Sequence, residues 1–224
     1  DNNTNWRQKR ANIQLLGHMA YCAPRQLSNN LPVVVKALTE NLSDAHSEVS
    51  EAARKALERV GSAVANPEIT SQVPVIINAL EDPEKYADVV LEALIHTRFT
   101  HSIDVAALAL LVPILLRGLK ERTIQIKRKS AQIMGSMSLL TTDSKDLMPY
   151  IPTVVPLLKN CLMDPNPQVR TASAKAIGSL CKTIGQDQMG DIIPWLHDTL
   201  KRTDNKFSTV ERGGAAQALC EIIA

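Results

Sequence analysis

The sequence is poor in aromatic residues, which make up 3% of its 224 positions. A β-sandwich is richer in aromatic and β-branched strand residues, so this scarcity argues against an all-β fold. Leu, Ile, Val and Ala must then supply most of the core, and they suit closely stacked helices. The hydrophobic share of 45% is enough for a continuous core of that kind. The composition therefore favours an all-α fold.

The sequence also has no cysteine motif. Its four cysteines, Cys22, Cys161, Cys181 and Cys220, are far apart in apolar, helical settings. They form no Cys-x-x-Cys pair and have no histidine at zinc-finger spacing. Isolated thiols of this kind are typical of reduced core cysteines in a cytosolic protein, and we expect that state for all four.

Motifs for catalysis and metal binding are missing as well. There is no Gly-rich phosphate loop, nucleophile elbow or pair of catalytic carboxylates. His96 and His101 are the nearest two of five scattered histidines, and a spacing of five does not put them on one helix face. Gly213 and Gly214 fall in a helical pattern, where we expect them to allow close helix approach. The sequence predicts no enzyme, no cofactor and no small-molecule substrate.

Long apolar runs and a strong net charge are also absent. No signal-peptide pattern is present, and no apolar run is long enough to cross a bilayer, so no membrane partner is expected. The formal net charge of +2 excludes a surface that is a polyanion clamp throughout, but it allows a local basic patch.

What the sequence does contain is a repeat. Apolar-proline dipeptides recur at steps of 42, 39, 39 and 42 residues: Leu31-Pro32, Val73-Pro74, Val112-Pro113, Ile151-Pro152 and Ile193-Pro194. Each precedes an apolar run, a polar turn and a second amphipathic segment. Proline is tolerated in the first turn of a helix, so each dipeptide is expected to open the first helix of its repeat. This period and two-helix plan predict an α-solenoid of HEAT repeats with about five helix pairs.

We expect one continuous array over residues 1–224. Its predicted parts are residues 5–28, the second helix of a truncated repeat, and the repeats 29–66, 71–98, 104–142, 147–186 and 190–224. Neither terminal helix has the polar outer face of a capping repeat, and there is no initiator methionine. We therefore expect a fragment of a longer array.

The densest basic cluster lies in the central repeat. It comprises Arg117, Lys120, Arg122, Lys127, Arg128 and Lys129, against the single acid Glu121. On the second helix of that repeat, helical spacing predicts that Arg128 points away from the buried face. A cluster of this kind on a repeat scaffold suits the phosphate backbone of rRNA or an acidic protein. The alternative is an ordinary solvated helix face.

A second pattern concerns the corners between helices. HEAT repeats favour an Asp in the turn and a basic residue after a β-branched one, as in Asp164 followed by Val169-Arg170, and Ile126-Lys127 is a second copy of the basic position. One interpretation of these residues is a structural ladder between neighbouring repeats.

Several ungapped segments resemble one family. They are residues 20–27 (AYCAPRQL), 66–69 (NPEI), 97–104 (TRFTHSID) with 108–110, 145–151 (KDLMPYI) and 164–170 (DPNPQVR). Together they resemble the central part of the general control non-derepressible one family, very large HEAT-repeat activators of the amino-acid-starvation response. The basic segments 117–122 and 127–129 are similar to the HEAT domain of fungal translation elongation factor three. Two departures are Ser50, where a basic residue would be favoured, and Asp104, which is not followed by the expected proline.

The resemblance implies a non-enzymatic scaffold, cytoplasmic and polysome-associated. It would bind the ribosome and an ABC-type ATPase partner and help to activate the kinase of initiation factor two, which other parts of the full-length chain would contact. Two alternatives stay open. One is the HEAT domain of an elongation-factor-three-type translation ATPase, which would need two nucleotide-binding cassettes downstream. The other is a generic HEAT protein–protein adaptor.

Overall fold

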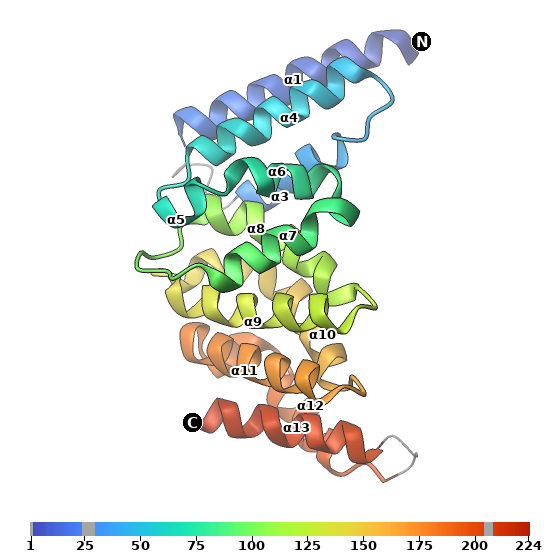
Figure 1. Cartoon of the computed structure of the whole chain (residues 1–224), viewed down its shortest axis with the longest axis vertical. Coiled ribbons are helices and arrows are strands. Elements are labelled where there is room, and N and C mark those ends of the chain that lie inside the picture. The colour runs from blue at the N-terminus through green and yellow to red at the C-terminus, as the bar shows by residue number, and fades with distance from the viewer. Residues whose placement is uncertain (1, 24–29, 204–207) are drawn as a thin grey trace. The chain divides into compact units, whose positions relative to one another are not determined.

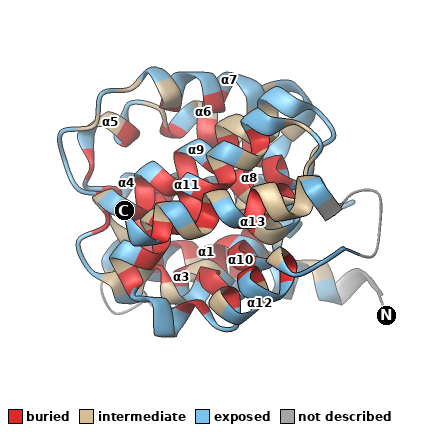
Figure 2. Cartoon of the chain, turned by 90° about the horizontal axis from the view of Figure 1, so that it is seen from below, coloured by how far each residue is buried: buried red, intermediate tan, exposed pale blue. Residues whose placement is uncertain are grey.

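The structure is a computed structural model that describes residues 2–23, 30–203 and 208–224. Its elements are α-helices joined by short corners and a few 3₁₀ turns (Figure 1). The all-α prediction is confirmed. Buried positions fall on the helix sides that face neighbouring helices (Figure 2). Leu, Ile, Val and Ala make up most of this core, as the composition predicts.

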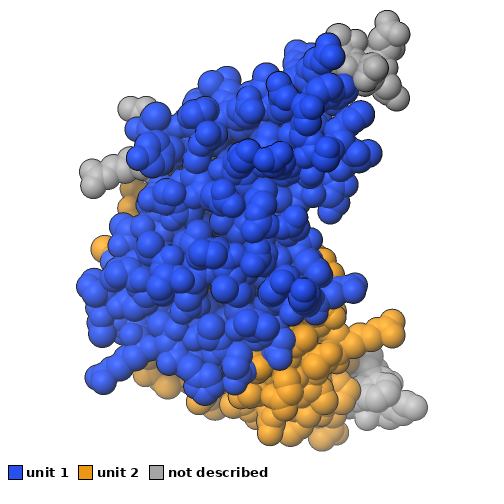
Figure 3. Space-filling model, turned by 45° about the horizontal axis from the view of Figure 1, so that its top comes forward, with its two compact units in different colours: residues 1–114 blue, residues 115–224 orange. Residues whose placement is uncertain are grey.

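The chain divides into two compact units, residues 1–114 and 115–224 (Figure 3). Unit 1 contains α1 (Asn2–Cys22), α3 (Leu31–Glu40), α4 (Ser47–Ser62), α5 (Pro67–Thr70), α6 (Val73–Glu81), α7 (Pro83–His96) and the first part of α8 (Val105–Lys120). Helix α1 packs along α4, and α6 packs against α7.

Unit 2 contains the end of α8, then α9 (Ile124–Leu140), η2 (Ser144–Asp146), η3 (Met148–Tyr150), α10 (Ile151–Leu162), α11 (Pro167–Ile184), η4 (Gln186–Met189), α12 (Ile192–Leu200) and α13 (Ser208–Ile223). The second helices of successive pairs, α9, α11 and α13, lie side by side in one layer (Figure 1). Helices α10 and α12 pack against α11 and α13 from the other layer. The prediction of a single array over 1–224 stays a prediction.

Prolines mark helix starts at most of the expected positions. Pro32, Pro74 and Pro152 each lie in the first turn of their helix, where the missing N–H costs no hydrogen bond. Pro194 is the third residue of α12. The repeated dipeptide is therefore a good signal for the start of a first helix.

The expectation that Val112-Pro113 opens a helix is wrong. Pro113 lies inside α8, which begins eight residues earlier at Val105. A proline in a helix interior costs about 3 kcal/mol because it removes one hydrogen bond and crowds the preceding turn. The apolar run from Ala106 to Val112 is buried throughout, and this burial outweighs that cost.

The expectation of core thiols is wrong for two of the four cysteines, Cys22 and Cys220. Cys161 and Cys181 are buried, and burial raises the pKa of Cys161 and raises the pKa of Cys181 to about 11. Cys22 and Cys220 are free but exposed, because each lies on the uncovered side of its helix, α1 or α13. Helical spacing alone did not distinguish these two sides.

Candidate functional site

The six predicted cations separate into two groups. Arg117, Lys120 and Arg122 lie at the corner where α8 ends and α9 begins, and all three are exposed. The Arg117 Nε atom is 3.8 Å from Glu121 Oε1, and both side chains are about half exposed. An exposed pair at this distance contributes little, so it leaves the charge of the corner available. We call these three residues the basic corner.

Lys127, Arg128 and Lys129 lie in the first half of α9 and are only partly exposed. Lys127 Nζ donates a hydrogen bond of 2.5 Å to Asp164 Oδ2, in the corner between α10 and α11. The exposed fractions of these two side chains are 21% and 10%. Lys127 therefore joins one helix pair to the next.

Asp164 is held on both sides. Its Oδ1 atom accepts a hydrogen bond of 2.9 Å from the backbone N–H of Asn166. Burial alone would raise the pKa of Asp164, but the hydrogen bonds from Lys127 and from the Asn166 backbone outweigh it, and the pKa lies below its usual value. The carboxylate is therefore ionised at neutral pH.

Unit 1 contains the same arrangement. Lys9 Nζ on α1 is 2.5 Å from Asp44 Oδ2, in the corner between α3 and α4. The Oδ1 atom of Asp44 accepts from the backbone N–H of His46, two residues on. Because the same device joins a second helix to the following corner in both units, it supports the ladder interpretation. We therefore interpret Lys127 as part of the structural ladder between repeats and not as a binding residue.

The Asp164→Asn variant tests this ladder. Asn retains an oxygen for the Asn166 N–H but removes the charge, and we expect a loss of about 1–2 kcal/mol of stability at pH 7. A carboxylate with a depressed folded pKa stabilises above its unfolded pKa of about 3.9 and loses that contribution as pH falls through the folded value. The difference between the wild-type protein and the variant should therefore be smaller at pH 3 than at pH 7.

Urea denaturation at both pH values measures that difference. The Lys127→Met exchange is the partner control, since it should cost much less in the Asp164→Asn background than alone. Additive losses, or a difference at pH 3 as large as the one at pH 7, would contradict the ion pair.

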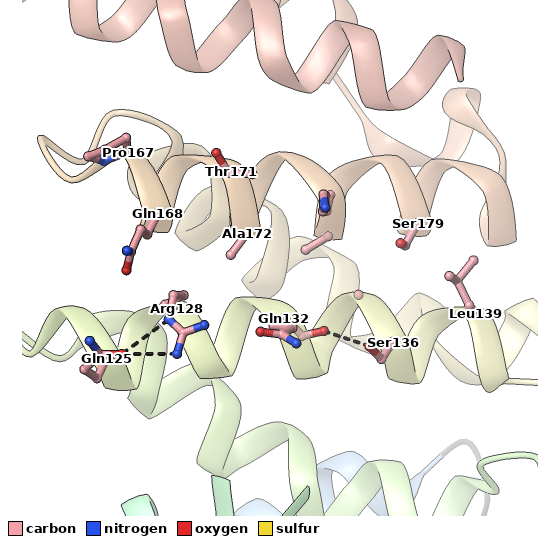
Figure 4. A pocket seen from close by; sticks show the side chains of 13 residues that line it. Gln125, Arg128, Gln132, Ser136, Leu139, Pro167, Gln168, Thr171, Ala172 and Ser179 are labelled. Carbon is pink, nitrogen blue, oxygen red and sulfur yellow. Dashed lines mark hydrogen bonds between the residues drawn. The ribbon is translucent and has the colours of Figure 1, made fainter. Parts of the chain in front are cut away.

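Arg128 points to a different surface. Its Nε and Nη2 atoms donate to Gln125 Oε1 at 3.3 and 3.1 Å, one turn earlier on α9. Both residues line an open groove of about 840 Å³ between α9 and α11 (Figure 4). The lining residues from α9 are Gln125, Arg128, Gln132, Gly135, Ser136 and Leu139, and those from α11 are Pro167, Gln168, Thr171, Ala172, Lys175, Ala176 and Ser179. We call this the α9–α11 groove.

The two helices approach closely at Gly135 and Ala176, which both line the groove and which we call its floor. A Cβ atom on Gly135 would lie 3.0 Å from the Cα atom of Ala176, so a larger residue would push the helices apart. Three carboxamides, three hydroxyls and two cations surround this floor, and the lining includes no Asp or Glu. The groove is therefore polar and positively charged.

Only part of this site was predicted from the sequence. The prediction included Arg128, but Gln168 and Lys175 are far away in the sequence and reach the groove only because α11 packs on α9. The available signal was the helical spacing of polar residues on the corresponding face of α11. Only Arg128 of the predicted six lines the groove.

Within the residues that the structure describes, no group of three or more His, Cys, Asp or Glu side chains is placed to hold a metal ion. Among the same residues, no helix is both long and apolar enough to span a bilayer.

Comparisons with known proteins identify the family. The model named Elongation factor 3/GNC1 HEAT repeat matches residues 85–191, and the EF3 N-terminal HEAT repeat matches residues 1–57. Over 98% of the chain, identity is 48% to Protein ILITYHIA of Arabidopsis thaliana, 47% to Stalled ribosome sensor GCN1 of Homo sapiens and 42% to eIF-2-alpha kinase activator GCN1 of Saccharomyces cerevisiae. The chain belongs to the GCN1 family. The predicted HEAT-repeat solenoid and the family resemblance are both confirmed.

The extent of the match and its level of identity describe the relationship to GCN1 more closely. The chain spans about 8% of the length of these relatives, so it matches one segment of each of them. Elongation factor 3 proteins are more distant, at 29–32% identity over 78–97% of the chain. The difference in identity favours the GCN1 branch over the elongation-factor branch.

Proposed function

We propose that this chain is a non-enzymatic scaffold segment of a ribosome-associated translational stress regulator, and that its basic corner contacts rRNA. The names of its relatives, a stalled ribosome sensor and eIF-2-alpha kinase activators, support the general role. The observation that carries the contact is the exposure of Arg117, Lys120 and Arg122 at one corner. Exposed cations close together suit a phosphate backbone, since each phosphate contact releases a counterion.

The finer parts of the proposal concern partners and location. We place the segment on cytoplasmic polysomes, where an ABC-type ATPase would dock beside it. The kinase of initiation factor two would be contacted by other parts of the full-length chain. In this scheme the segment contributes to kinase activation by holding the scaffold on the ribosome.

The structure changes which residues this proposal uses. Lys127 is engaged with Asp164, so we assign it to the ladder and not to the ribosome contact. Arg128 and Lys129 are only partly exposed and would contribute at the edge of the contact surface. The basic corner is its centre.

Co-sedimentation with purified ribosomes across a salt series tests the basic corner. We expect the triple variant Arg117→Glu, Lys120→Glu and Arg122→Glu to bind about tenfold or more weakly at ~0.15 M salt. The slope of log K against log salt should also fall by roughly 2–3, because each of the three lost phosphate contacts removes about 0.7–0.9 of a unit.

A control of equal net charge shows whether position matters. Lys145, Lys182 and Lys201 are exposed cations of the same unit outside the basic corner, and changing all three to Glu should leave binding within about threefold of wild type. Equal losses in both triple variants would mean that overall charge and not the basic corner drives binding. Unchanged binding by the corner variant would remove it as a contact.

A further inference from the structure

We infer that the α9–α11 groove binds an extended, acidic segment of a partner protein. This goes beyond the proposed rRNA contact and does not depend on it, because the three basic-corner residues at the centre of that contact lie outside the groove. Arg128, at the edge of the contact surface, also lines the groove. The inference rests on the length of the groove, the hydrogen-bonding groups that line it and its charge.

The groove has the length of a short extended peptide. Its α9 wall runs from Gln125 to Leu139, which at 1.5 Å per residue is roughly 21 Å. Its α11 wall runs from Pro167 to Ser179. An extended chain advances about 3.4 Å per residue, so the groove accommodates about six residues of a peptide lying between the two helices.

Carboxamides in the lining match a peptide backbone. A glutamine side chain both donates and accepts, which complements the N–H and C=O groups that every peptide unit presents. The carboxamides of Gln132 and Gln168 have no hydrogen-bond partner among the described residues, so both are available. In Figure 4, Gln168 and Ala172 of α11 are directed toward α9 across the groove. The low floor at Gly135 and Ala176 lets a backbone approach closely.

Charge selects the side chains of that peptide. Arg128 on one wall and Lys175 on the other provide two cations, and the lining contains no carboxylate to neutralise them. Lys175 is exposed and makes no ion pair within the described part of the chain. Arg128 uses two of its nitrogens on one neutral carboxamide, which leaves further N–H donors for a ligand carboxylate. Asp and Glu residues in the bound segment are therefore favoured.

The same lining fits single-stranded RNA poorly. Sites for unpaired nucleotides stack the bases on aromatic side chains, and no aromatic residue lines this groove. The phosphate groups themselves present only acceptors, so along them the carboxamide oxygens would find no donor except the ribose 2′-hydroxyls. A peptide uses both halves of each carboxamide.

Fluorescence anisotropy with the whole 224-residue chain tests the inference. The probe is a fluorescein-labelled octapeptide of alternating Glu and Ala, about the length of the groove plus one residue at each end. We expect saturable binding that the Arg128→Glu/Lys175→Glu variant weakens at least tenfold. A matched Lys-Ala octapeptide and a labelled uridine octamer should each bind at least tenfold more weakly than the acidic peptide.

Two further comparisons separate backbone recognition from charge. Backbone N-methylation of the acidic peptide keeps its carboxylates but removes its N–H donors, and we expect at least about fivefold weaker binding. The Gln132→Ala/Gln168→Ala variant should bind the unmodified acidic peptide more weakly by a similar factor. It should then bind the unmodified and the N-methylated acidic peptides equally. Circular dichroism and thermal melting of each variant show that the helices are intact.

The basic corner is the matched control. The variant Arg117→Gln, Lys120→Gln and Arg122→Gln should bind the acidic peptide within about twofold of wild type at ~0.15 M salt. Failure of the ribosome contact would thus leave peptide binding unchanged. Absence of peptide binding, insensitivity to the Arg128→Glu/Lys175→Glu exchange, or tighter binding of the uridine octamer would each overturn the inference.

Discussion

Gly214→Ala is expected to destabilise unit 2 by about 2–3 kcal/mol, whereas Gly213→Ala should stabilise it by about 0.5–1 kcal/mol. A Cβ atom on Gly214 would lie 2.0 Å from the carbonyl oxygen of Leu162, the last residue of α10. That oxygen belongs to the backbone and cannot rotate away, so α13 would have to move. At Gly213 a Cβ atom meets nothing within 4 Å, and the alanine gains only helix propensity.

Urea denaturation followed by far-UV circular dichroism measures both effects on adjacent residues of one helix. The sequence pattern predicts that the glycine pair allows close helix approach, and within the pair the structure assigns that role to Gly214 alone. Gly178 of α11 provides a second close approach to the same helix, since its Cβ atom would lie 2.6 Å from the carbonyl oxygen of Glu221. Equal stability of the two alanine variants would show that α13 is not fixed by the contact at Gly214.

Local patterns predicted the helices well because the signals that define them are local. Apolar spacing gave the order and type of the helices, and proline in the first turn gave the starts of α3, α6 and α10. The failure at Pro113 comes from the dipeptide pattern taken alone. The unbroken apolar run from Val105 to Val112 predicts a long helix from Val105 through Gly118, and α8 follows that run.

The candidate site was less predictable, because neighbours in the sequence have different roles in space. Lys127 and Arg128 are adjacent, yet Lys127 pairs with an aspartate 37 residues away while Arg128 lines the α9–α11 groove. The ladder could be predicted from the sequence, since Asp164 and Lys127 both occupy positions of the HEAT pattern. The groove was not, because its α11 wall depends on how two helices pack.

Asp104→Ala is expected to cost about 3 kcal/mol in the stability of unit 1, because one side chain accepts four backbone hydrogen bonds. Its Oδ1 atom accepts from the N–H groups of Ala106 and Ala107 in the first turn of α8, each at 3.0 Å. Its Oδ2 atom accepts from the N–H groups of Ala65 and Asn66, also at 3.0 Å. Loss of a helix cap costs about 1 kcal/mol, and buried N–H groups without a partner cost more.

Asn66 makes this junction cooperative. Its side chain is 2% exposed, its Oδ1 atom accepts from Ile69 N–H, and its Nδ2 atom donates to the carbonyls of His101 and Ser102. Asp104 and Asn66 thus hold the segment before α8 against the start of α5, with each satisfying the backbone of the other's segment. Loss of either residue should free both segments.

A graded series distinguishes this junction from an ordinary helix cap. Asp104→Asn keeps one acceptor oxygen but turns its NH₂ group toward N–H donors. We therefore expect the stability of unit 1 in this variant to lie between that of the wild-type protein and that of Asp104→Ala. Asp143→Ala is the control, because the exposed Asp143 accepts one local hydrogen bond, from Lys145 N–H, and should cost less than about 1 kcal/mol. Native-state hydrogen exchange at the amides of Asn66 and Ala107 should accelerate together in Asp104→Ala. If only the Ala107 amide exchanges faster, Asp104 caps α8 without joining it to α5, and the two segments are held by other contacts.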